Sequence, residues 1–472
     1  MSDVITRGLV LAIATAPLLI ACGGGNASDP APINTPQCSG ASCPVQGPPP
    51  QGTVAALCPA TADIGNGSYL GGAGSGEVVS LNINATAMTY SLTWLQSPIP
   101  LHTGEVTPTR AGVTVTGAVV HPPAGTLPTA EQTRCAFILT PGSGTAAVDG
   151  STYSTAATFN QANPPMVLIG LGVAGGGIPG AAIQYNGFQP TAAVLGPQLS
   201  SLLGINLFPV AARNFDFYPF LGFTSVDTNL ADLKGNYNAL FYHLQPSNKY
   251  ATTATTAQES FDGAGNCSVP SGASNTACES TGQTWTAVSG QSYFTSQDAP
   301  RLMPAPSLLG GVVTFPIAAS ANMILGKVNG QVIPLVVRTG QVDPTNLVVD
   351  DESGIAMLAG ATQIQSGAIN GGYVGADSNF DYTATLLQSA GGTFVNPTTS
   401  SAESAFALDY SQQHTGLLGV TDTQGNTGSL IASGGLYAIF INGEENGGVT
   451  ASSANSDTLN QPYFGIGAQI SK

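Results

Sequence analysis

Charged side chains are scarce in this sequence of 472 residues. Asp, Glu, Lys and Arg make up 8% of it, whereas ordinary soluble domains carry roughly 25%. Lys and Arg together number 10, and the net charge is −16. A chain with so few cations lacks the basic surface that nucleic-acid recognition needs. The composition therefore predicts no nucleic-acid partner.

Sequence motifs that carry catalysis are also missing. The chain has no Gly-x-Ser-x-Gly pentapeptide, which presents the nucleophile in many serine hydrolases. It has no Cys-x-x-Cys and no Cys/His cluster of the kind that holds zinc. The histidines lie far apart in the sequence, at His102, His121, His243 and His414. We predict no cofactor, no metal and no catalytic residue, and we lean towards a protein that is not an enzyme.

A Gly-x-Gly-x-x-Gly spacing at residues 170–175 follows the apolar run 166–169. This spacing is typical of a dinucleotide-binding turn, which needs a helix directly after it. The residues that follow, "GGGIPG" at 175–180, cannot propagate a helix. No acidic residue between Asp149 and Asp216 is available to bind a ribose hydroxyl. We interpret the passage as a tightly packed turn between strands.

The first residues have the pattern of a lipoprotein signal. Arg7 precedes the apolar run 9–20, which is too short to span a bilayer but has the length of a signal-peptide core. The run ends in "LIACG", which resembles the bacterial lipobox, where the cysteine is lipidated and becomes the mature N-terminus. We predict a signal peptide over 1–21 and a lipid anchor on Cys22, which several acyl chains would make stable. An ordinary cleaved signal is the alternative.

The residue after the lipobox cysteine and the segment beyond it bear on location. Gly23, rather than Asp, follows the cysteine, which favours an outer-membrane lipoprotein on the periplasmic face or the cell surface. Residues 22–57 are rich in Gly, Ser, Asn and Pro and have few large apolar side chains. Such a segment cannot bury enough surface to fold, so we predict a flexible tether.

The chain has 7 cysteines. If Cys22 carries lipid, an even number remains in an oxidising compartment, which favours disulfides. Their positions along the chain suggest three pairs: Cys38–Cys43, Cys58–Cys135 and Cys267–Cys278.

The remainder of the chain has β-strand patterns nearly throughout. Residues 77–83 and 88–94 are β-rich around a short polar turn, as in a hairpin. We predict an all-β fold of antiparallel sheets in one or two barrel-like or sandwich-like units. Strand should exceed about 35% and helix stay under about 15%. We expect one β-rich unit over 58–231 and another over 232–472.

The densest apolar patch is the aromatic run over residues 215–223. Aromatic faces supply large contact areas, so this run is a candidate lining for a small apolar ligand. Packing in the core is the alternative. The pocket residues would be Phe215, Phe217, Tyr218 and Phe220.

Two acidic passages are further candidates. In "DDE" at 350–352, Asp350 and Glu352 share one strand face, where paired carboxylates can act as acid and base. Asp-x-Asn-x-Asp at 377–381 matches the first half of a calcium loop of the EF-hand type. Tyr382 and Gln388 stand where that loop needs Gly and Glu, which excludes the full loop and leaves a looser oxygen site open.

Several passages of the chain are similar in sequence to a known protein family. They include "GVAGGGIPGA", "FDFYPFLGFTS" and "GLYAIFINGEENGG". The chain resembles the proteobacterial lipoproteins grouped as domain of unknown function 2957, over nearly all of residues 58–472. That family has no established activity, ligand or catalytic residue, so the resemblance implies a lipoprotein and adds no site.

Taken together, the patterns favour a non-catalytic, lipid-anchored protein of a Gram-negative cell envelope. We expect a β module that contacts the membrane through its lipid anchor and binds an envelope protein or a small apolar ligand. The alternative is an envelope hydrolase that acts on glycan or polyester through the carboxylates of Asp350 and Glu352.

Overall fold

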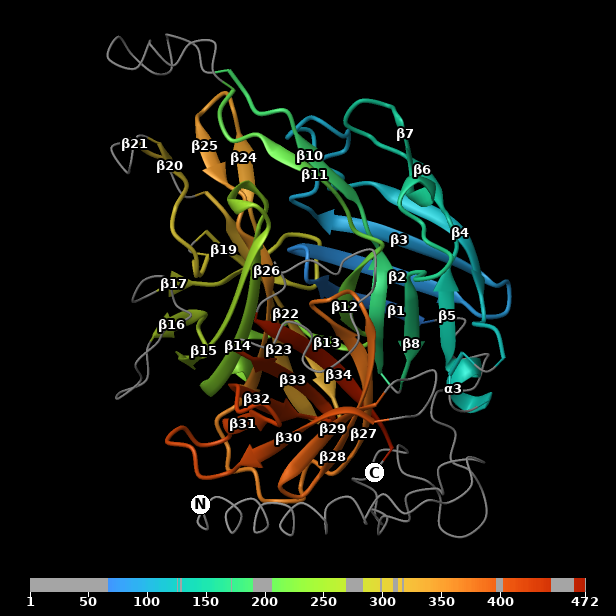
Figure 1. The fold of residues 1–472 in the computed structure, drawn as a ribbon. Coiled ribbons are helices and arrows are strands. Elements are labelled where there is room, and N and C mark those ends of the chain that lie inside the picture. Colours follow the sequence, from blue (N-terminus) through green and yellow to red (C-terminus); the bar gives the residue numbers. More distant parts are fainter. Residues whose placement is uncertain are drawn as a thin grey trace, which may run out of the picture. The chain divides into compact units, whose positions relative to one another are not determined.

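Strands dominate the computed structural model of the protein (Figure 1). Of the described residues, 57% lie in strands and 4% in helices, so the prediction of an all-β fold is confirmed. None of the helices in this part of the chain is long and apolar enough to cross a membrane. The signal peptide, Cys22 and the tether lie outside the described residues. The structure describes residues 67–124, 126–127, 130–170, 172–189, 206–268, 283–297, 299–308, 313–315, 318–395, 402–442 and 462–471.

The first sheet closes into a barrel. Its strands follow the order β3-β2-β1-β12-β9-β8-β5-β4, and β3 pairs with β4 to complete the ring. A short helix, α3 (Ala130–Cys135), precedes β5, and β6 (Ser143–Thr145) and β7 (Thr152–Ser154) extend the sheet beyond β4. The barrel strands are β1 (Gly67–Ala73), β2 (Glu77–Asn84), β3 (Thr89–Gln96), β4 (Thr114–Val120), β5 (Ala136–Leu139), β8 (Met166–Ile169), β9 (Val173–Pro179) and β12 (Phe217–Phe223).

The predicted hairpin is strands β2 and β3 of this barrel. Their residues alternate between the buried interior and more exposed positions, which is the pattern of a strand with one face on the core. The side-chain oxygen of Asn84 accepts hydrogen bonds from the backbone N–H groups of Thr86 and Ala87, at 3.0 and 2.8 Å. This local bonding fixes the turn.

The second sheet is open. Its order is β17-β16-β15-β14-β26-β23-β22-β19-β18, with β13 (Val226–Asp227) paired to β22. Three two-stranded sheets of the described residues lie outside it: β10 (Ala182–Tyr185) with β11 (Val210–Asn214), β20 (Ser307–Leu308) with β21 (Val313–Thr314), and β24 (Gln341–Asp343) with β25 (Val348–Asp350). The long strands of the open sheet are β14 (Gly235–Gln245), β15 (Ala251–Phe261), β22 (Ser320–Val328), β23 (Gln331–Thr339) and β26 (Ser353–Gly360). The short ones are β16 (Asn266–Ser268), β17 (Gln283–Thr284), β18 (Thr286–Ala287) and β19 (Phe294–Ser296).

The third sheet is a second closed barrel, coloured orange to red in Figure 1. Each strand pairs with the next in the chain, and β27 pairs with β34 to close it. The strands are β27 (Gly371–Asp377), β28 (Tyr382–Gln388), β29 (Gly391–Val395), β30 (Ala402–Asp409), β31 (Leu418–Asp422), β32 (Thr427–Ser433), β33 (Leu436–Ile441) and β34 (Tyr463–Ser471).

The three sheets pack against one another through shared apolar clusters. One cluster joins Phe223 of the first barrel, Ile355 of the open sheet and Phe464 of the second barrel. The predicted boundary at residue 231 falls between β12, the last strand of the first barrel, and β14, the first long strand of the open sheet, and 232–472 contains most of the open sheet and the whole second barrel. The division into two units stays a prediction.

Burial on both faces explains the unbroken apolar runs. All residues of β12 are buried. Tyr218 and Phe220 pack in the core of the first barrel, whereas Leu221 and Phe223 belong to the cluster shared with the other sheets. A strand covered on both sides has no solvent-facing positions and therefore shows no polar alternation.

Candidate functional site

The acidic passage at 350–352 lies deep in the structure. The Asp350 side chain, at the end of β25, is fully buried. Its two oxygens accept hydrogen bonds from Arg338 Nη2 at 2.9 and 3.0 Å, and Arg301 Nη1 donates to it at 2.9 Å. The backbone N–H groups of Ala318 and Ala319 add two more, at 3.2 and 3.1 Å. Both carboxylate oxygens are therefore fully used by the protein.

Glu352 is equally enclosed. His243 Nδ1 lies 2.7 Å from one carboxylate oxygen, and the backbone N–H of Leu302 donates to the same oxygen at 2.8 Å. The other oxygen lies 3.6 Å from Arg301 Nε. Burial tends to raise the pKa of Glu352, but the hydrogen bond from His243 and the positive charge of Arg338 outweigh it and lower the pKa to about 2. Burial lowers the pKa of His243 itself.

This buried ion cluster consists of His243, Arg301, Arg338, Asp350 and Glu352. Asp350 and Glu352 both contact Arg301. The charges of the two carboxylates are compensated by the guanidinium groups of Arg301 and Arg338. No side chain of the cluster is more than 8% exposed. An acid or base must reach the group whose proton it transfers. A histidine and two carboxylates do converge here, but their side chains are at most 2% exposed, so the geometry gives the hydrolase alternative no support.

A second buried ion pair, Glu77 with Arg110, lies in the first barrel, and neither residue was singled out from the sequence. Arg110 donates to the two oxygens of Glu77 at 2.7 and 2.6 Å, and both side chains are 0% exposed. The guanidinium lies 4.2 Å from the Trp94 ring centroid and donates to the Tyr153 hydroxyl at 2.9 Å. The hydroxyl of Ser97 donates to Glu77 at 2.5 Å. The sequence feature that could have indicated this pair is a single Glu, Glu77, at the start of an apolar strand.

A cleft of about 560 Å³ lies against both ion pairs. Ser97, which contacts Glu77, forms part of one wall, and Ala318, whose N–H binds Asp350, forms part of the other. The first barrel contributes the segment 96–111, and the open sheet and its hairpin contribute residues around 318–320 and 339–343. The polar side chains of the cleft include Gln96, Ser97, Gln297, Ser320, Thr339 and Gln341.

The lining of the cleft is polar and mostly neutral. Its lining residues, all within the described part of the chain, include no Lys, Arg or His. The charged side chain among them, Asp343, accepts hydrogen bonds from the backbone of Thr345 and from the side chain of Asn346, at 2.9 and 2.6 Å. The side-chain bond from Asn346 lowers the pKa of Asp343. The lining therefore offers hydroxyl and amide groups without an acid–base pair.

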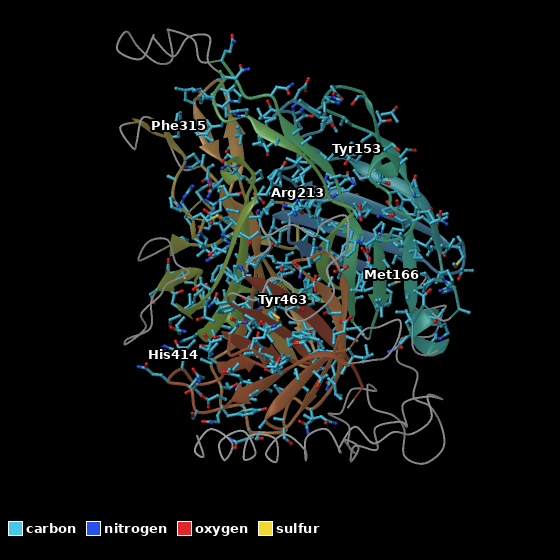
Figure 2. All side chains as sticks on the ribbon, viewed as in Figure 1. Tyr153, Met166, Arg213, Phe315, His414 and Tyr463 are labelled. Atoms are coloured by element: carbon cyan, nitrogen blue, oxygen red, sulfur yellow. The ribbon has the colours of Figure 1, made fainter. Side chains whose placement is uncertain are left out.

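The four histidines lie in different surroundings. His102 pairs with Asp149 at 2.8 Å in an exposed position, and His121 Nδ1 lies 3.0 Å from a backbone carbonyl of β5. His243 belongs to the buried ion cluster. His414 lies between β30 and β31, and Figure 2 shows it at the periphery of the molecule.

The aromatic run lines neither this cleft nor the small cavity described below. Phe215, Phe217, Tyr218 and Phe220 are at most 1% exposed. Phe217 stacks on Tyr382 of the second barrel, with ring centroids 4.7 Å apart. A ligand pocket formed by this run stays a prediction, and the packing seen here is that of a core. Asp216, within the run, accepts hydrogen bonds from two asparagine side chains, Asn160 and Asn163, at 3.0 and 3.3 Å.

The glycine-rich passage is a strand, so its interpretation as a turn over 170–180 was wrong. The chain turns around Gly172 and then forms β9, which pairs with β8 and β12. No helix follows, as a dinucleotide site would need. The glycines admit close neighbours: a Cβ at Gly176 would lie 2.3 Å from the carbonyl oxygen of Met166, and one at Gly177 would lie 2.4 Å from the Phe217 ring.

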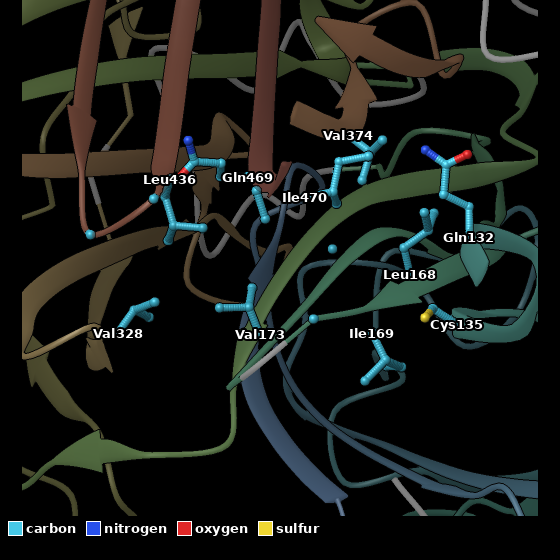
Figure 3. A pocket seen from close by; sticks show the side chains of 15 residues that line it. Gln132, Cys135, Leu168, Ile169, Val173, Val328, Val374, Leu436, Gln469 and Ile470 are labelled. Carbon is cyan, nitrogen blue, oxygen red and sulfur yellow. The ribbon is translucent and has the colours of Figure 1, made fainter. Parts of the chain in front are cut away.

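A small cavity beside this strand is shown in Figure 3. Val173 of β9, Leu436 of β33 and Ile470 of β34 are among the side chains that line it. Its volume is about 20 Å³, which is room for about one water molecule. It is too small to hold a ligand.

The calcium-like passage forms the turn between β27 and β28. Asp377 is fully buried, and one of its oxygens accepts hydrogen bonds from the N–H groups of Asn379 and Asp381, at 2.9 and 3.1 Å. Burial, reinforced by the charge of Asp381, raises the pKa of Asp377 well above its ordinary value. No three Asp, Glu, His or Cys side chains in the described ranges are placed to hold one metal ion.

The cysteine pairings stay predictions. Cys135 and Cys267 are buried, at 3% and 1% exposed. Their expected partners, Cys58 and Cys278, lie outside the described residues, as do Cys38 and Cys43.

A family model described as "Protein of unknown function (DUF2957)" matches residues 89–468. The chain belongs to this family. No curated protein matches it. The predicted family is therefore confirmed, and membership brings no activity with it.

Two solved structures show a distant likeness. The isotype 1 transferrin binding protein B from serogroup B Neisseria meningitidis is 10% identical, with a TM-score of 0.20 over 83% of this chain and 65% of that one. Intact Ap-TbpB (N and C lobes) is 8% identical, with a TM-score of 0.18 over 83% and 66%. The chain spans slightly less than two thirds of either protein. Similarity this low carries no conclusion about function.

Proposed function

We propose that this protein is a non-catalytic, lipid-anchored component of the cell envelope that binds a partner or ligand through the cleft between the first barrel and the open sheet. One contrast carries the proposal. The histidine and carboxylates that could act as acid and base are enclosed and charge-compensated. The cleft, in contrast, presents neutral amide and hydroxyl groups to solvent.

The sequence supports the location. A signal peptide over 1–21 and lipidation of Cys22 would hold the protein at the outer membrane, on the periplasmic face or the cell surface. A flexible tether over 22–57, as the composition predicts, would have an r.m.s. length of roughly 30–35 Å. That reach would let the folded body stand away from the bilayer, so that the cleft can meet its ligand.

A hydrolase assay tests the non-catalytic part of the proposal. Purified wild-type protein and its Asp350→Asn variant are assayed on envelope glycans and on soluble polyester substrates. We expect no turnover by either protein. Turnover by the wild type that disappears in a still-folded Asp350→Asn variant would overturn the proposal and restore the hydrolase alternative.

A further inference from the structure

The walls of the cleft carry little charge: among the lining residues that the structure describes, Asp343 is the one charged side chain. Behind one wall the charge of Glu77 is cancelled by Arg110, and behind the other Asp350 is cancelled by Arg338. These pairs are at most 1% exposed, so neither sends an unbalanced charge towards the cleft. The carboxylate of Asp343 is already hydrogen-bonded within its own hairpin. An anionic ligand would therefore lose its hydration in the cleft without gaining an opposite charge. A cationic ligand would meet a carboxylate whose oxygens already accept hydrogen bonds within the hairpin.

The base of the cleft is held in place by internal hydrogen bonds. The Thr339 hydroxyl donates to the carbonyl of Gly76 at 2.8 Å and accepts from Asn322 at 3.3 Å. The Ser97 hydroxyl donates to Glu77 and accepts from the N–H of Ile99 at 3.1 Å. Groups fixed in this way lose little conformational freedom when a ligand arrives.

Other side chains in the lining still have hydrogen-bonding capacity. Gln297, Ser320 and Gln341 make no side-chain hydrogen bond to another described residue. Gln96 uses one N–H for the Tyr293 hydroxyl, at 3.2 Å, and keeps its carbonyl oxygen. Each of these groups comes from a different segment, and hydroxyl and carboxamide groups both donate and accept. A ligand that is complementary to these side chains has many groups on its surface that can each donate and accept a hydrogen bond.

We infer that this cleft binds a short, uncharged oligosaccharide through its hydroxyl groups. The inference rests on the proposed binding function and names its ligand class. A volume of about 560 Å³ lies within the range of small-molecule sites. A main-chain peptide ligand is the less favoured class, because it is normally read by a row of backbone groups along a strand edge. The polar lining groups here are side chains from scattered segments.

Binding should be weak and insensitive to salt. No aromatic side chain is among the lining residues in the described part of the chain, so a sugar ring gains no stacking face. Hydrogen bonds alone suggest a Kd on the order of 1 mM. Because the proposed oligosaccharide is uncharged, the Kd should not change between about 0.05 and 0.5 M salt.

The test is ligand-observed NMR on the full-length protein in a detergent without a sugar headgroup. The probes are cellobiose, lactose, maltotriose and N,N′-diacetylchitobiose. The variant Ser320→Ala/Gln341→Leu removes two lining groups that the fold does not use. Gln331→Leu is the matched control, since Gln331 is an exposed residue at the opposite end of β23. Circular dichroism checks that all three proteins are folded.

We expect at least one probe to bind the wild type and the control equally. We also expect it to bind the double variant about tenfold more weakly, as the loss of two hydrogen bonds implies. Equal binding to the double variant, a salt-dependent Kd, or no binding by any probe would overturn the inference. Binding of tri-alanine in place of every sugar would overturn it in favour of a peptide ligand.

A second measurement distinguishes an incorrect ligand class from an incorrect proposal that the cleft binds a ligand at all. A photo-crosslinking residue at position 341 is activated in living cells. If no sugar binds but an envelope protein is captured there, the ligand class is wrong and the binding function stands. If sugars fail and no partner is captured, both are wrong.

Discussion

Substitution of Glu352 by Gln separates a structural role of the buried ion cluster from a catalytic one. In a hydrolase, removing the acid or base abolishes turnover and leaves the fold intact. In this structure Glu352 compensates Arg301 and accepts hydrogen bonds from His243 and from the backbone. A glutamine there has no charge and brings an N–H₂ group towards donors that need an acceptor. We expect the variant to lose stability.

The size of this stability loss can be worked out from the pKa of Glu352. This pKa falls from its ordinary value of 4.5 to about 2, which corresponds to about 3 kcal/mol at neutral pH. Breaking a buried ion pair by removing one partner costs about 3–5 kcal/mol, in agreement. Because the folded-state pKa is depressed, this contribution is complete above pH 4.5 and is lost as the pH falls towards about 2.

Denaturant unfolding measures the effect. The tryptophans, Trp94 and Trp285, are buried and report unfolding by fluorescence. Glu352→Gln should lower the free energy of unfolding at pH 7 by about 3 kcal/mol, and the gap to wild type should narrow as the pH falls below 4.5. Glu105→Gln, at an exposed position, is the control and should match wild type. A Glu352→Gln variant as stable as wild type at pH 7 would refute the structural role.

Three further predictions follow from the described geometry and the sequence. The Asp377→Asn variant should become more stable relative to wild type as the pH rises. The raised pKa of Asp377 means that the fold favours its protonated form, so its ionisation destabilises the wild type. A difference in melting temperature that does not change with pH would contradict this. Gly177→Ala should cost about 1–3 kcal/mol, since its Cβ would lie 2.4 Å from the Phe217 ring, whereas Gly360→Ala, with nothing within 4 Å, should cost less; equal urea midpoints would count against the close packing. Cys22→Ser should release the protein into the soluble periplasmic fraction while wild type partitions into detergent, and identical fractionation would show that Cys22 carries no anchor.

The sequence was sufficient for the fold class and for strands with one solvated face. The hairpin over 77–94 was predictable because its residues alternate and Asn84 provides a local turn. Strand β9 was not recognised because all of its residues are buried and its sequence shows no polar alternation, so the passage was interpreted as a glycine-rich turn. Strand β12 is also buried throughout.

The buried ion cluster and the cleft could not be predicted from the sequence, for a different reason. His243 and Glu352 are 109 positions apart in the chain and meet because β14 pairs with β26, which places His243 opposite Gly354. The cleft likewise combines the segment 96–111 with residues after 318. Pairings of this kind depend on which strands become neighbours, and that information is not local. The acidic residues themselves were visible in the sequence; their charge compensation was not.

The scarcity of charge has a second consequence once the structure is known. Three of the 10 Lys and Arg residues, Arg110, Arg301 and Arg338, are buried against carboxylates. Arginine suits these positions because its guanidinium stays charged when buried and meets a carboxylate with two parallel hydrogen bonds. Cations committed to the interior are not available at the surface to select an anionic partner. Surface cations are therefore a poor basis for recognition by this protein, and the side chains that line the cleft are mostly neutral hydrogen-bonding groups.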